Sequence, residues 1–81
     1  FELNQLAVYP NPSKDTFYIK LQNNKTYDLQ VLDITGKKLF TKTKINTSTP
    51  FPLQMQGYSS GIYFLHITID NQKTTKKLIL N

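Results

Sequence analysis

The chain has 81 residues, a formal net charge of +5 and no cysteine. This length fits one domain, and the lack of cysteine excludes disulfides and thiolate metal sites. The chain has ten lysines and no arginine. Because arginine is the residue that makes bidentate contacts to bases and phosphates, the charge favours a solubilising surface over a nucleic-acid interface.

Taken in order, the sequence consists of short β-branched and aromatic runs separated by turn signals, with almost no helical periodicity. Phe1–Gln5 is typical of a linker end, and residues 6–81 form the predicted domain. Strands are predicted over Leu6–Tyr9, Thr16–Leu21, Thr26–Asp33, Lys37–Thr41, Phe51–Met55, Gly61–Ile69 and Gln72–Leu80. A polar turn at Gln22–Lys25 joins the second and third, and the fifth belongs at a sheet edge because Pro50 and Pro52 cannot donate to a ladder. Seven strands at this spacing predict an all-β, seven-stranded, immunoglobulin-like sandwich of two sheets.

The segment after the first strand is rich in proline. Tyr9 and Asn11 each precede a proline, which disfavours helical geometry at both positions. Pro10 and Pro12 have a fixed φ and no N–H donor. The segment is therefore predicted to be a stiff bend, with a contact surface as the alternative interpretation.

Asp33-Ile34-Thr35-Gly36 predicts a β-hairpin. Aspartate at the first position and glycine at the fourth suit a type I turn, and the Asp33 carboxylate can accept a bond from a backbone N–H two residues on. Gly36 can then take the left-handed conformation and complete a three-residue loop with a bulge. A catalytic or metal-binding Asp33 is the minority interpretation.

The sixth strand is the longest apolar segment. Tyr63, Leu65, Ile67 and Ile69 fall on one face at period two and are predicted to face the opposing sheet. Gly61, at the start of this strand, is predicted to permit a positive φ or close backbone packing. The hydroxyl of Tyr63 needs a hydrogen-bond partner in such a position.

The titratable side chains favour a domain without catalysis. His66 lies mid-strand with no cysteine or acid nearby, so a metal cluster is not expected. The five acids are dispersed and lack the spacing of a calcium loop, and the isolated glycines form no phosphate-binding loop. We therefore predict neither enzyme activity nor a required metal or cofactor.

Four motifs together resemble the type A C-terminal sorting domain of the type IX secretion system. They are, in order, Tyr9-Pro10-Asn11-Pro12, Asp33-Ile34-Thr35-Gly36-Lys37, Gly61-Ile62-Tyr63-Phe64 and Lys76-Lys77-Leu78-Ile79-Leu80. Their order, spacing and placement against the C-terminus carry the resemblance, which covers about residues 6–81. The Asp70-Asn71-Gln72 turn departs from the family, in which glycine is more usual, so a less regular turn is expected there.

The resemblance implies that the chain is a substrate of an export machinery and catalyses nothing. In this family the domain follows a covalently linked N-terminal cargo of a Gram-negative bacterium, which crosses the inner membrane by a signal peptide and passes through the periplasm. An outer-membrane translocon and its shuttle protein then recognise the folded domain. A cell-surface sortase usually removes it and leaves the cargo at the cell surface or outside the cell.

The resemblance places recognition at the end of the chain, on Lys76, Lys77, Leu78, Ile79, Leu80 and Asn81. Taken alone, this segment is a final strand whose lysines keep a sheet edge from aggregating, and both lysines are expected to be exposed. The motifs at Asp33–Gly36 and Gly61–Tyr63 are interpreted as fold determinants.

The alternative function comes from another class, an adhesive or carbohydrate-binding β-sandwich appended to a secreted enzyme. Exposed aromatic side chains such as Tyr18, Tyr58 or Phe64 would form its platform. Rows of rings facing solvent would favour this alternative, whereas the C-terminal placement and the lysine-rich ending favour the sorting signal.

Overall fold

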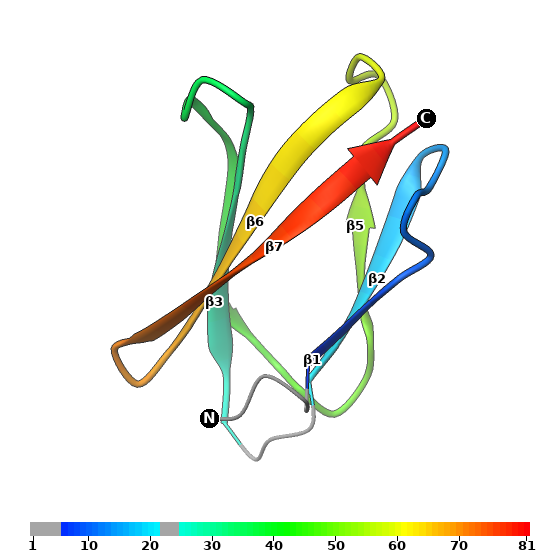
Figure 1. Ribbon diagram of the computed structural model, residues 1–81. Coiled ribbons are helices and arrows are strands. Elements are labelled where there is room, and N and C mark those ends of the chain that lie inside the picture. The colour runs from blue at the N-terminus through cyan, green and yellow to red at the C-terminus, as the bar shows by residue number, and fades with distance from the viewer. Residues whose placement is uncertain (1–5, 22–24) are drawn as a thin grey trace.

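A computed structural model describes residues 6–21 and 25–81 as an all-β sandwich (Figure 1). Its strands are β1 (Leu6–Tyr9), β2 (Thr16–Leu21), β3 (Tyr27–Leu32), β4 (Lys38–Ile45), β5 (Phe51–Gln54), β6 (Gly61–Ile69) and β7 (Gln72–Leu80). The predicted fold class is confirmed. The predicted linker at 1–5 and residues 22–24 of the predicted polar turn lie outside the described residues.

Two antiparallel sheets form the sandwich. One has three strands in the order β1-β2-β5, and the other has four in the order β4-β3-β6-β7. This three-plus-four arrangement is that of immunoglobulin-like domains. β5 lies at an edge, as its prolines predicted, and Pro52 pairs there with Tyr18 of β2.

The core lies between the two sheets and is built from the alternating faces of their strands. On β6 the four residues predicted to point inward, Tyr63, Leu65, Ile67 and Ile69, are all buried. Phe17 and Ile19 of β2 face them from the three-stranded sheet and are also buried. Because the side-chain period of a strand is two, each of these strands leaves its other residues on an outer face.

β4 is longer than predicted. The prediction ended it at Thr41, but the strand continues to Ile45. Ile45 is buried and pairs with Tyr27 of β3, which holds the extension in place. The register shifts on the way, where Lys44 has a φ of +54° and its N–H donates to the Asp28 carboxylate at 2.9 Å.

The hairpin between β3 and β4 has the geometry predicted from its sequence. The N–H of Gly36 donates to the Asp33 carbonyl at 3.0 Å, the N–H of Asp33 donates to the Lys37 carbonyl at 3.0 Å, and Gly36 has a φ of +90°. The Asp33 carboxylate accepts bonds from the N–H and the hydroxyl of Thr35 and from the N–H of Lys37. This is a type I turn followed by a glycine bulge.

Replacing Gly36 by valine is expected to destabilise the domain by about 1–3 kcal/mol, the cost of holding a β-branched residue at a positive φ. A Cβ at this position would meet nothing within 4 Å, so the cost comes from the backbone alone. Gly36→Asn is the control, because asparagine tolerates the left-handed region. In urea denaturation the parent should be the most stable, the Asn variant intermediate and the Val variant the least stable. A valine variant as stable as the parent would rule out this turn geometry.

The turn between β6 and β7 is more regular than its sequence led us to expect. Ile69 pairs with Gln72, which leaves a two-residue loop. Both loop residues are left-handed, with φ of +49° at Asp70 and +68° at Asn71. This is the backbone of a type I′ turn, which aspartate and asparagine can adopt without glycine. Asp70 also forms an ion pair with Lys25.

Candidate functional site

The six residues predicted to carry the recognition signal are divided by the sheet between two faces of β7. Leu78 and Leu80 point into the core and are 0% and 2% exposed. Lys77 and Ile79 alternate with them and point outward, Lys77 exposed and Ile79 half-buried. Asn81 follows the strand and is exposed. A partner that meets the folded domain can therefore reach Lys77, Ile79 and Asn81 but not the two leucines.

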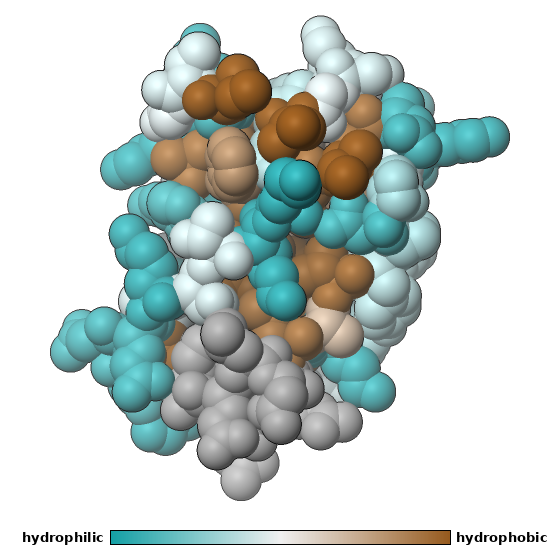
Figure 2. Space-filling model, viewed as in Figure 1, coloured by the Kyte–Doolittle hydropathy of each residue, from teal (hydrophilic) through white to brown (hydrophobic). Residues whose placement is uncertain are grey.

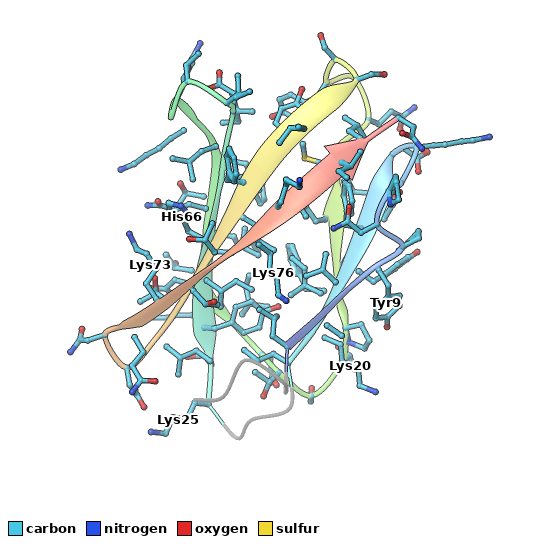
Figure 3. All side chains as sticks on the ribbon, in the orientation of Figure 1. Tyr9, Lys20, Lys25, His66, Lys73 and Lys76 are labelled. Carbon is cyan, nitrogen blue, oxygen red and sulfur yellow. The ribbon has the colours of Figure 1, made fainter. Side chains whose placement is uncertain are left out.

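The two lysines of this segment lie on opposite faces. Lys76 pairs in the register with the buried Leu65, so its side chain lies on the core side of the sheet, where it is half-buried. Figure 3 shows the side chain directed from β7 toward β1. The expectation that both lysines are exposed is wrong for Lys76, because strand alternation separates neighbouring residues. The pair does not form one charged patch.

Asn11 connects the proline-rich segment to the final strand. Its Nδ2 donates to the carbonyl of Lys77 at 2.8 Å, 66 positions away, and its Oδ1 accepts from the N–H of Ile79 at 3.0 Å, 68 positions away. A side-chain amide carries a donor and an acceptor side by side, as a peptide group does. Asn11 therefore extends the hydrogen-bond ladder on the outer edge of β7.

Ser13 continues the same contact. Its N–H donates to the carbonyl of Ile79 at 3.0 Å, and the N–H of Asn81 donates to its carbonyl at 2.8 Å. Ser13 is itself buried, and it forms a parallel bridge with Leu80. We call Asn11 and Ser13 together the edge clasp. In Figure 1 the C-terminal end of β7 lies beside the connection between β1 and β2 that carries the clasp.

The edge clasp was not identified from the sequence, which predicted a stiff bend with a contact surface as the alternative. The Tyr9–Pro10 and Asn11–Pro12 peptide bonds are both cis, and neither proline has an N–H to donate. The bonds from this segment to β7 are made by the Asn11 side chain and the Ser13 backbone. An asparagine between two prolines is the sequence signal that could have indicated a side-chain contact.

Asn11→Ala should destabilise the domain by about 1–3 kcal/mol, because it removes two hydrogen bonds that fix the end of β7. Asn46→Ala is the matched control, since Asn46 is also exposed and its Oδ1 accepts one local bond, from the N–H of Ser48. Thermal melting followed by circular dichroism compares the two. If both variants have the same melting temperature, the Asn11 bonds of the clasp contribute no more to stability than the local bond of Asn46.

The other motif residues lie in the scaffold that supports the site. The Tyr9 ring stacks on Tyr18 of the neighbouring strand, with centroids 6.0 Å apart and an angle of 27° between planes. Gly61 has a φ of +153°, and open space surrounds the position where a Cβ would be, so backbone conformation rather than close packing explains the glycine. The Tyr63 hydroxyl donates to the Ser59 carbonyl at 2.6 Å.

Among the described residues, the titratable side chains either hold local structure together or lie at the surface. No three histidine or acidic side chains of residues 6–21 and 25–81 come together as metal ligands. His66 lines a shallow polar hollow of about 170 Å³ with Gln30, Thr41 and Lys73, and burial together with the charge of Lys73 lowers the pKa of its imidazole. The bonds from the Thr35 hydroxyl and the Lys37 N–H hold the pKa of Asp33 below its usual value.

The aromatic residues of the alternative function do not form one platform. Tyr18 lies on the outer face of the three-stranded sheet, Phe64 lies on the outer face of the four-stranded sheet, and Tyr58 lies in the loop before β6. Tyr58 instead packs edge-on against Tyr63, at 6.2 Å between centroids.

The described part of the chain also contains no helix able to span a bilayer.

Comparison with known proteins adds an independent finding. Residues 7–81 match the family described as "Secretion system C-terminal sorting domain". The chain is 32% identical over 81 residues to ulvan lyase NLR42 of Nonlabens ulvanivorans, a match covering 99% of the chain and 15% of the lyase. It is 30% identical over 78 residues to an endo-acting ulvan lyase of Formosa agariphila, covering 95% of the chain and 15% of the lyase. The chain thus spans about 15% of the length of these relatives.

Proposed function

This chain belongs to the secretion system C-terminal sorting domain family, and from that premise we propose that it directs a larger cargo through the outer membrane by the type IX secretion system. Members of this family are sorting tails and not catalytic domains. The observation that carries the proposal is the family match, which extends over residues 7–81 and so includes β2 to β7 and all of β1 except Leu6.

The cargo is proposed to be a polysaccharide lyase. Both relatives named above are ulvan lyases, and in each the matching part is a small fraction of a much longer chain. In this arrangement residues 6–81 form the sorting domain and residues 1–5 are the end of the linker to the cargo. The protein passes through the periplasm of a Gram-negative bacterium and then reaches the cell surface or the medium.

The proposed partners are an outer-membrane translocon, its shuttle protein and a cell-surface sortase. Within Lys76–Asn81, we assign the contact with the translocon to the side chains that the fold leaves accessible, Lys77, Ile79 and Asn81. The buried leucines between them anchor the strand to the core. Recognition in this form requires a folded domain, because only the folded sheet places Lys77 and Ile79 on its outer face and Asn81 at the end of β7.

Deletion of residues 6–81 from the full-length protein in its natural host tests the proposal. The cargo lacking the domain should accumulate in the periplasm, while the full-length protein reaches the surface or the medium. Fractionation with an antibody against the cargo measures both. Secretion of the truncated cargo at the normal level would show that the signal lies elsewhere.

A further inference from the structure

The outer face of the four-stranded sheet has an unpartnered apolar region at one end. Ile34, at the tip of the β3–β4 hairpin, is 71% exposed, and Ile62 of β6 is 40% exposed. Ile62 pairs in the register with Ile79, and Phe64 follows Ile62 on the same face. We call these four residues the outer apolar patch. Figure 2 shows apolar side chains gathered at this end of the face, above a largely polar region.

The outer apolar patch is hollowed on one side. A cavity of about 400 Å³ lies between the hairpin loop and β6, lined by Leu32, Ile34 and Phe64 among others. The hollow is open to solvent, so it can accept a side chain that projects from a partner. Exposed apolar surface of this kind is commonly an interaction site in a small soluble domain.

Lysine side chains are the cationic groups beside the patch, and Asp33 is the one acid among the described residues that lines the hollow. Lys77 pairs with Phe64 in the register and points outward on the same face, and Lys37 closes the hairpin loop. The nearby acid, Asp33, has its carboxylate engaged by the N–H groups of its own turn. A second copy of this chain would bring lysines against lysines, which is unfavourable. Charge complementarity therefore favours a protein surface with an apolar centre and an acidic rim.

We propose that a protein component of the export machinery docks on the outer apolar patch. It places an apolar side chain in the cavity beside Phe64 and acidic side chains against Lys77 and Lys37. The inference rests on the proposed function and extends the recognition surface from the C-terminal segment to the hairpin loop and β6. Residues more than forty positions before the end of the chain, such as Ile34, then take part in sorting.

Serine substitutions on exposed positions test the patch in a fluorescent fusion that carries residues 1–81 and is expressed in a host with a type IX system. Ile34→Ser and Ile62→Ser together should lower the exported fraction roughly tenfold or more, the effect of losing well-packed contacts at a docking surface. Tyr18→Ser is the matched control, because Tyr18 is 41% exposed and lies on the opposite sheet. Urea midpoints of the purified domains establish that all variants are folded.

The outcomes separate this inference from the function on which it rests. If the parent fusion stays in the periplasm, the proposed function fails. If the parent is exported and the double serine variant is exported equally well, or falls only as far as Tyr18→Ser, the docking surface is wrong. Co-sedimentation with vesicles of phosphatidylcholine and phosphatidylserine provides a further arm. Binding by the parent that the double variant loses would assign the patch to lipid and overturn a protein partner.

Discussion

Removal of Leu78–Asn81 is expected to unfold the domain. Truncating one buried leucine costs about 2–5 kcal/mol, so the loss of Leu78 and Leu80 costs about 4–10 kcal/mol. A domain of 81 residues has a total stability of roughly 4–12 kcal/mol at ordinary values per residue. The deletion also removes the bonds that Ser13 makes with Ile79 and Asn81. Little or no stability remains.

Far-UV circular dichroism and urea denaturation of the truncated domain measure this effect. We expect a spectrum without the β signature and no cooperative transition. A transition at the midpoint of the parent would show that the end of β7 contributes little to the core. Because the truncation removes the fold, its failure to be exported cannot identify a signal, and the signal has to be tested with substitutions on the outer face.

Lys77→Glu is expected to lower export of the fusion roughly tenfold or more while the domain stays folded. Lys77 is exposed, so the free energy of unfolding should change by no more than about 0.5 kcal/mol. Its reversal places a negative charge opposite the acidic rim of the proposed partner, and like charges across an interface oppose docking. The exported fraction and the urea midpoint are measured on the same variant.

Lys73→Glu is the matched control for this substitution. Lys73 lies on the same strand and the same outward face, and it is also exposed, but it lies at the end near the β6–β7 turn, away from the outer apolar patch. Lys76→Gln adds a second comparison on the core side of the sheet. Equal export of the Lys77 and Lys73 variants would remove Lys77 from the recognition surface.

Strand positions could be predicted where hydrophobic alternation is strong. β6 and β7 have the predicted bounds. On β6 the buried residues alternate from Tyr63 to Ile69, and the turn signal at Asp70 and Asn71 separates the two strands. The end of β4 could not be found in this way. Its last residues are polar and partly irregular, and they form a strand only because Tyr27 and the Asp28 carboxylate on β3 hold them.

The candidate site could be predicted in part. The turn at Asp33–Gly36 was predicted from local residue chemistry, and the assignment of recognition to the final strand came from the family resemblance. The edge clasp depends on a contact between residues 66 positions apart, which no local pattern encodes. The difference between Lys76 and Lys77 does follow from strand alternation, since Leu78 and Leu80 fix the inward face, and it could have been predicted from the register.

Export of a passenger protein tests the central claim most directly. Residues 1–81 are fused behind a fluorescent protein that carries an inner-membrane signal peptide, and the fusion is expressed in a host with a type IX system and in the same host without its translocon. The fluorescence should reach the surface or the medium in the first host and stay in the periplasm in the second. Fluorescence confined to the periplasm of both hosts would contradict the sorting function.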